Sequence, residues 1–91
     1  MELPDFETFC TAALAQGYET VVPREWAAGA EVPRHTHPFE ADALVVQGEM
    51  WLTVGDHTHY LVPGGRFHLV PGTEHSERYG AEGATYWVAR R

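Results

Sequence analysis

Glycine and proline interrupt the chain about every eight to ten residues from Gly17 onward. The stretches between them are short and rich in β-branched and aromatic residues, and the clearest runs cover residues 43–46, 51–54, 67–70 and 85–88. Four residues make little more than one helical turn, but they are a usual length for a strand. Many short strands with turn residues at this spacing are typical of β-sandwiches and barrels. The sequence therefore predicts an all-β architecture after residue 17.

The first residues differ, because their apolar positions repeat with helical spacing. The positions i, i+3, i+4, i+7 and i+8, which share one stripe of a helix, are Phe6, Phe9, Cys10, Ala13 and Leu14. Asp5 is suited to cap the start of this helix, and Gly17 is suited to end it. A chain of 91 residues has room for one hydrophobic core. We expect a single domain over residues 1–91, with a short helix at about 5–16 and a barrel at about 18–90.

Gly55-Asp56 favours a two-residue hairpin turn, because both residues tolerate positive φ. The resulting register sets Leu52 opposite His59 on the more apolar face of the hairpin, which we expect to point inward. Trp51 and Tyr60 then become cross-strand neighbours on the other face. Such an aromatic pair can bury area against a second copy of the chain.

Composition excludes several classes of partner. The formal net charge is −7, and the chain contains arginine but no lysine. It therefore lacks the basic surface that nucleic acid requires. No apolar run approaches the roughly 20 residues of a membrane span, and the acidic start is not that of a signal peptide. A single cysteine, Cys10, excludes an internal disulfide, so we expect a cytoplasmic protein. Because the chain is short and its edge strands need cover, we also expect a homodimer.

Histidine is over-represented, with six residues in the chain, and four of them form the pairs His35/His37 and His57/His59. Alternate side chains of an extended segment share a face, so His35 and His37 point the same way. Two imidazoles on one face can bind a single metal ion, and His75 is the best-placed third ligand. The alternative is that these histidines are solvent-exposed and simply form a polar surface.

The spacing around these histidines resembles the two sequence motifs of the cupin superfamily. The residues that carry the resemblance, in the order of the motifs, are Gly29, His35, His37, Gly48, Gly65, Pro71, Gly72 and His75. The resemblance covers about residues 29–79. It implies a small antiparallel jelly-roll barrel, in agreement with the many short strands. It also implies that His35, His37 and His75 are metal ligands.

The chain departs from the family pattern at one ligand position. Cupins usually have a glutamate seven residues before the glycine that corresponds to Gly48, and Ala41 stands there. Glu40 and Asp42 flank Ala41, but strand alternation points both to the opposite face. A bulge would turn one of them inward, and Glu40 is the better candidate for a fourth ligand because it follows the turn at Pro38.

The resemblance implies a divalent transition metal, with Fe first and Mn, Ni, Cu or Zn as alternatives, because these ligand types select poorly among them. A three-histidine site is similar to that of iron cupins that add dioxygen to small thiols or diketones. We therefore expect a metal-dependent, dioxygenase-like enzyme that acts on a small organic molecule. The alternative is a non-catalytic small-molecule-binding or sensor cupin without a functional metal site. The residues that we expect to line the substrate pocket are His59, Arg66, Met50 and Phe39.

Overall fold

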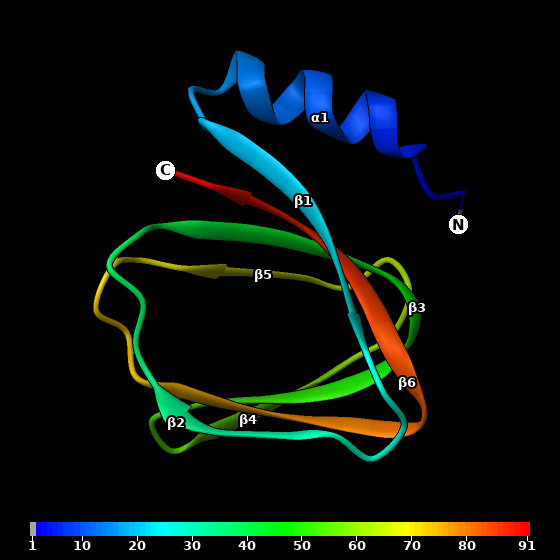
Figure 1. Cartoon of the computed structure of the whole chain (residues 1–91), viewed down its shortest axis with the longest axis vertical. Coiled ribbons are helices and arrows are strands. Elements are labelled where there is room, and N and C mark those ends of the chain that lie inside the picture. Colours follow the sequence, from blue (N-terminus) through cyan, green and yellow to red (C-terminus); the bar gives the residue numbers. More distant parts are fainter. Residues whose placement is uncertain (1) are drawn as a thin grey trace.

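Two long strands organise the fold. The computed structural model describes residues 2–91, which form one helix and six strands. In chain order the elements are α1 (Phe6–Ala15), β1 (Thr20–Trp26), β2 (Glu31–His35), β3 (Ala41–Val54), β4 (His57–Leu61), β5 (Arg66–Leu69) and β6 (His75–Arg90). All strand pairs are antiparallel, and β3 pairs with β6 along most of its length. Figure 1 shows these two strands curving from one layer of the barrel into the other.

The long strands correct one expectation, because residues 43–46 and 51–54 belong to the single strand β3. The strand bends at Gly48, whose φ is 76°, and the register with β6 shifts on both sides of it. A Cβ atom at Gly48 would collide with the carbonyl oxygen of Gly83 in β6. Glycine thus lets the two strands turn the corner together without a loop.

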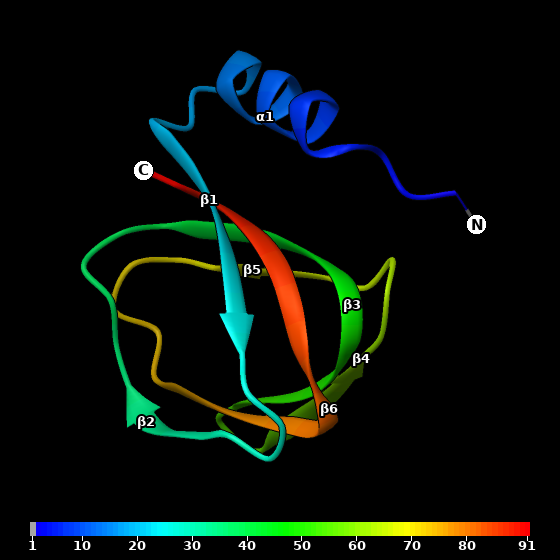
Figure 2. The same ribbon diagram turned by 45° about the vertical axis from the view of Figure 1, so that its right-hand side comes forward.

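The strands form two layers with the core between them. One layer holds β1, β5, the first half of β3 and the second half of β6. The other holds β2, β4 and the remaining halves of the two long strands. Figure 2 shows the same arrangement from another side. The largest fully buried side chains are Tyr79, Met50, Leu52 and Val45. The predicted antiparallel barrel with a short N-terminal helix is confirmed.

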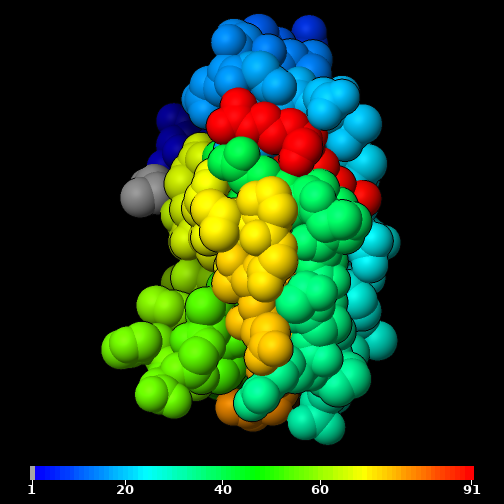
Figure 3. Space-filling model, turned by 90° about the vertical axis from the view of Figure 1, so that its left-hand side faces the viewer, coloured from blue at the N-terminus to red at the C-terminus, as the bar shows by residue number. Residues whose placement is uncertain are grey.

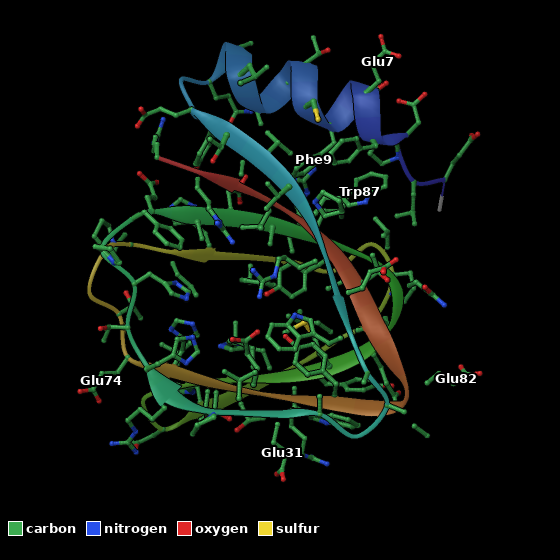
Figure 4. All side chains as sticks on the ribbon, in the orientation of Figure 1. Glu7, Phe9, Glu31, Glu74, Glu82 and Trp87 are labelled. Carbon is green, nitrogen blue, oxygen red and sulfur yellow. The ribbon has the colours of Figure 1, made fainter. Side chains whose placement is uncertain are left out.

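The helix α1 covers the outer face of the first layer. Its start is capped as predicted, since the Asp5 carboxylate accepts a hydrogen bond from the backbone N–H of Thr8 at 2.8 Å. Phe9 is buried against Trp87 of β6, as Figure 4 shows. Leu14 is 54% exposed, contrary to the predicted stripe, because it lies about 100° further round the helix than the buried Ala13. Within residues 2–91, no helix has the length and apolar character needed to cross a membrane.

The hairpin of β3 and β4 has the predicted register. Leu52 pairs with His59, and Trp51 pairs with Tyr60. The rings of Trp51 and Tyr60 lie 5.2 Å apart, and Tyr60 is 55% exposed. Their contact with a second copy of the chain stays a prediction.

Candidate metal centre

Three histidines meet at one end of the barrel. His35 is the last residue of β2 and lies directly opposite His75, the first residue of β6. Opposed residues of antiparallel strands project their side chains from the same face, with Cβ atoms about 4.5–5.5 Å apart. His37 follows two residues later, and its carbonyl oxygen accepts a hydrogen bond from the N–H of Gly72 at 2.9 Å. Figure 3 faces this end, where the segments after β2 and before β6 lie side by side.

The backbone fixes the orientation of two of the rings. Nδ1 of His35 lies 2.8 Å from the carbonyl oxygen of Pro33, and Nδ1 of His75 lies 2.9 Å from that of Thr73. A carbonyl oxygen only accepts, so each Nδ1 carries the hydrogen and donates it. The lone pair of each neutral ring is then on Nε2. Both Nε2 atoms are therefore prepared to bind a positive ion.

The three rings are close enough to share one ligand. Their centroids lie 4.2–4.9 Å apart in the pairs among His35, His37 and His75. Each ring offers one nitrogen that lies within 4.8 Å of the other two. His75 is 2% exposed, and the other two rings are partly buried. The structure thus brings together the histidines that the sequence analysis selected.

Glu77 adds a carboxylate to this group, and the sequence analysis missed it. Glu77 is 7% exposed, and its Oε2 lies 3.7 Å from Nε2 of His35 and 3.7 Å from Nε2 of His75. This separation is too long for a hydrogen bond, but it is near the roughly 3.4 Å between two ligands of one tetrahedral ion. The signal was present in the sequence. Glu77 stands two residues after His75, and alternate residues of a strand share a face.

Two buried tyrosines hold Glu77 in place. Its Oε1 accepts hydrogen bonds from the hydroxyl of Tyr79 and, at 3.4 Å, from that of Tyr86. Burial raises the pKa of both phenols above the ordinary value. Both therefore stay protonated and donate at neutral pH. Because they occupy Oε1, the other oxygen of Glu77 is left facing the histidines.

The surroundings of His37 favour its neutral form. Burial, followed by the neighbouring His75 and His35, holds the pKa of His37 below its ordinary value. Phe39 stacks on the His37 ring with centroids 4.6 Å apart. Imidazole binds a metal only when it is neutral. His37 is thus kept in the form that a metal ligand requires.

The cluster borders a cavity of about 270 Å³ between the two layers. Phe39 lines this cavity, in agreement with the sequence analysis, and Phe67 and Leu69 add further apolar wall. Met50 does not line it, contrary to expectation. It is fully buried in the core, because it pairs with Tyr79 just past the bend of β3.

Glu40 is also placed differently from the expectation that it is a fourth ligand. Its Oε1 accepts a hydrogen bond from Nε of Arg91 at 2.8 Å, and its Oε2 lies 2.8 Å from Nε2 of His68. The bulge that would turn it inward does not form, since β3 pairs with β5 and β6 in regular register from Ala41. Regular alternation puts the buried Ala41 inside the barrel and Glu40 outside.

His59 and Arg66 lie at another opening of the barrel, apart from the histidine cavity, and their role in substrate binding stays a prediction. Both line a separate space of about 390 Å³, bordered by β4, β5 and the turn after β5. The guanidinium of Arg66 lies 3.9 Å from the carboxylate of Asp42. His59 is separated from the histidine cluster because its strand, β4, lies at one edge of the layer, whereas β2, which carries His35, lies at the other edge.

A comparison with protein families identifies this architecture. The family described as the AraC-like ligand binding domain matches residues 21–89, a range that contains the three histidines and Glu77. The chain belongs to this family. The chain has the fold of a small cupin, as its two glycine-containing motifs predicted. A comparison with curated proteins found no match.

Solved structures agree with this fold. The cupin domain of Cnp3 from Schizosaccharomyces pombe has a TM-score of 0.70 and 24% identity over 77% of this chain and 53% of its own. A conserved protein with a double-stranded β-helix domain from Klebsiella pneumoniae has a TM-score of 0.67 and 25% identity over 77% and 64%. The DMSP lyase DddQ from Ruegeria pomeroyi has a TM-score of 0.67 and 28% identity, over 78% of this chain and 36% of its own. This protein thus spans less than two thirds of the length of each of these three solved proteins.

Proposed function

We propose that the protein is a metal-dependent cupin that acts on a small organic molecule. The observation that carries this proposal is the convergence of three imidazole nitrogens, two of them with hydrogens fixed on backbone carbonyls, at the edge of a cavity. A histidine-rich surface without a ligand gives no reason for rings to be oriented in this way. Histidines that bind a metal through one ring nitrogen commonly donate the hydrogen of the other nitrogen to a carbonyl or carboxylate oxygen.

The residues present fit a divalent transition metal. His35, His37 and His75 would supply neutral nitrogen ligands, and Glu77 would supply one carboxylate oxygen. Two nitrogens bound at about 2.1 Å to one tetrahedral ion lie about 3.4 Å apart. The histidine nitrogens lie within 4.8 Å of one another, so the rings would have to move together by up to about 1.4 Å to bind one ion. Imidazole and carboxylate together suit Fe(II) first, with Mn, Ni, Cu and Zn as alternatives. When bound, the metal would act as a Lewis acid and would orient the substrate.

The remaining residues of the site act by positioning and exclusion. Tyr79 and Tyr86 keep the Glu77 carboxylate turned toward the histidines. Phe39 braces the His37 ring and, with Phe67, forms apolar wall that limits access of water to the cluster. These groups favour a small substrate whose polar end meets the histidines. Addition of dioxygen to a small thiol or diketone is the reaction class that we propose, because the three histidines resemble those of iron cupins that carry out this reaction.

A non-catalytic ligand sensor is the second candidate function. It is supported by the match to a family described as ligand binding and by the small cavity of about 270 Å³. Both candidates use the same cavity. They differ in whether the bound molecule is converted.

Metal analysis of protein purified without an affinity tag tests the proposal. We expect near-stoichiometric Fe, Mn, Ni, Cu or Zn in the wild type and its loss in His37→Ala. The matched control is His68→Ala, which removes a histidine from the outside of the barrel and should keep the metal. Metal-free wild-type protein after growth with each metal would refute the metal centre. Oxygen uptake with thiols and diketones then separates the candidates, since binding without uptake assigns the sensor role.

A further inference from the structure

The cavity beside the histidines contains two arginines that the metal centre does not use. Arg24 comes from β1 and Arg90 from β6, and both line the cavity together with Phe39 and the three histidines. Arg24 pairs with Tyr86, another lining residue, in the register of β1 and β6. Two arginine side chains therefore border the same small space as the histidine cluster.

Among the residues that the structure describes, neither arginine has an acidic partner. Within residues 2–91, the arginine ion pairs involve Arg34, Arg66 and Arg91. Arg24 and Arg90 contact aromatic rings instead, at 5.1 Å from the Trp26 centroid and 4.9 Å from the Phe39 centroid. The cavity thus retains cations that the protein's own acids leave uncompensated.

A buried donor of Arg90 also lacks a partner. Its Nε atom is inaccessible to solvent and makes no hydrogen bond within the described residues. Buried donors in folded proteins are nearly always hydrogen-bonded, and an exception calls for an explanation such as a missing ligand. The Arg90 donor would meet an acceptor from outside the chain if the guanidinium turned toward the cavity that Arg90 lines.

The carboxylate of Glu77 does not supply that acceptor. Of the residues that line the cavity, Glu77 is the acidic one. Its Oε1 is held by the two tyrosines and its Oε2 faces the histidines. A planar guanidinium with free donors recognises a carboxylate well, because two parallel hydrogen bonds can form.

From this arrangement we infer that the cavity binds a small organic acid. The acid group lies against Arg90 and Arg24, and the opposite, donor-bearing end of the molecule reaches the histidine cluster. The cavity volume of about 270 Å³ is below the roughly 300–1,000 Å³ of drug-sized sites, so the acid is short. Phe39, Phe67 and Val88 surround its apolar middle. This inference specifies the substrate class of the proposed function and rests on it for the role of the histidines.

Binding of matched acids and amides tests the inference. The probes are lactate, pyruvate, benzoate and 3-mercaptopropionate, each with its neutral amide, measured by calorimetry on full-length protein with and without metal. We expect at least one acid to bind roughly tenfold or more tightly than its amide, since hydrogen bonds to charged groups are strong. Arg90→Gln should remove this preference, and Arg24→Gln should reduce it. Arg66→Gln is the matched control, because Arg66 lies at the other opening, and it should keep the full preference.

The outcomes separate the two proposals. Acids that bind no more tightly than amides, or not at all, overturn the inference. So does a preference that survives both Arg90→Gln and Arg24→Gln, or tighter binding of inorganic phosphate than of every acid. Melting temperatures show whether each variant is folded. If Arg90→Gln does not fold, Arg24→Gln still tests the inference, because Arg24 is exposed. Protein that prefers acids but holds no metal refutes the metal centre alone, whereas metal without acid preference refutes this inference alone.

Discussion

The barrel carries two groups of histidine and carboxylate side chains that differ in what they contact. The inner cluster consists of His35, His37, His75 and Glu77, and the outer cluster of His68, Glu40, Asp42 and Arg91. In the outer cluster His68 lies 2.8 Å from Glu40, with 45% of its side chain exposed. In the inner cluster the closest histidine-to-carboxylate approach is 3.7 Å, with 1% of the His75 side chain exposed.

This difference separates a candidate site from a surface ion network. The outer groups contact each other directly, so their bonding needs are met within the protein. Exposed ion pairs of this kind contribute little to stability and are screened by salt. In the inner cluster His75 and Glu77 are buried and the other two rings are partly buried. Backbone carbonyls and tyrosines orient these groups, and three ring nitrogens lie within 4.8 Å of one another. The same residue types therefore support opposite conclusions, and geometry decides between them.

The largest expected effect is the loss of metal binding when a histidine of the inner cluster is replaced. The matched replacement in the outer cluster should have no such effect. A metal at about 100 times its dissociation constant stabilises the folded state by about 2.7 kcal/mol, which raises the melting temperature. His75→Asn should abolish this rise, whereas His68→Asn should leave it intact. Calorimetric melting with and without added metal measures both. An unchanged rise in His75→Asn would show that the inner cluster is not the metal site.

The carboxylates give the second contrast. Glu77→Gln keeps the size of the side chain and an acceptor for the tyrosines, but removes the charge that faces the histidines. We expect a loss of metal affinity of at least about 10–100-fold, which is the loss that follows removal of a group that merely supports a metal ligand. Glu40→Gln should leave the affinity unchanged. Competition with a chelator of known affinity measures this, and equal affinities in the two variants would exclude Glu77 from the site.

The clusters should also differ in the pH range in which they affect stability. Burial holds the pKa of His37 below its ordinary 6.5, so the unfolded chain takes up this proton first as the pH falls below 6.5. Metal-free protein should therefore lose stability below that pH. The hydrogen bond from Arg91 lowers the pKa of Glu40 below 4.5, so its stabilising effect is present above 4.5 and is lost as the pH falls through the lowered value.

Melting temperatures of metal-free variants between pH 8 and pH 3 test this separation. His37→Gln should flatten the curve in the upper range, and Glu40→Gln should flatten it only in the lower range. A wild-type curve without any decline between pH 6.5 and pH 5 would contradict the assignment for His37.

The smallest effect is expected for the ion pairs of the outer cluster. Glu40→Gln removes the contact with Arg91 and should lower the melting temperature slightly at low salt. At about 1 M salt the Debye length is about 3 Å, so the difference from wild type should shrink. A loss that is large and independent of salt would show that the outer cluster is more than a surface network.

Much of the fold could be predicted from local sequence signals. The cap at Asp5 and the turn at Gly55 depend on neighbouring residues, and both formed as expected. The continuity of β3 could not be read in the same way. It depends on the close approach of Gly48 to Gly83, which lie 35 positions apart in the sequence (83 − 48).

The site was predictable where strand alternation applied without a bulge. His35 and His37 share a face by alternation, and the same rule applied to β6 would have identified Glu77. Glu40 was selected by assuming a bulge that the structure does not contain. Arg90 was overlooked because its place in the cavity depends on the pairing of β6 with β1. No local sequence pattern predicts this pairing.

An anomalous difference map from crystals of the metal-loaded protein tests the central claim most directly. With data collected at the absorption edge of the bound metal, we expect one peak at about 2.0–2.2 Å from ligand nitrogens of His35, His37 and His75, with Oε2 of Glu77 in contact. A map with no peak among these three rings, or with its peak at the outer cluster, would contradict the account.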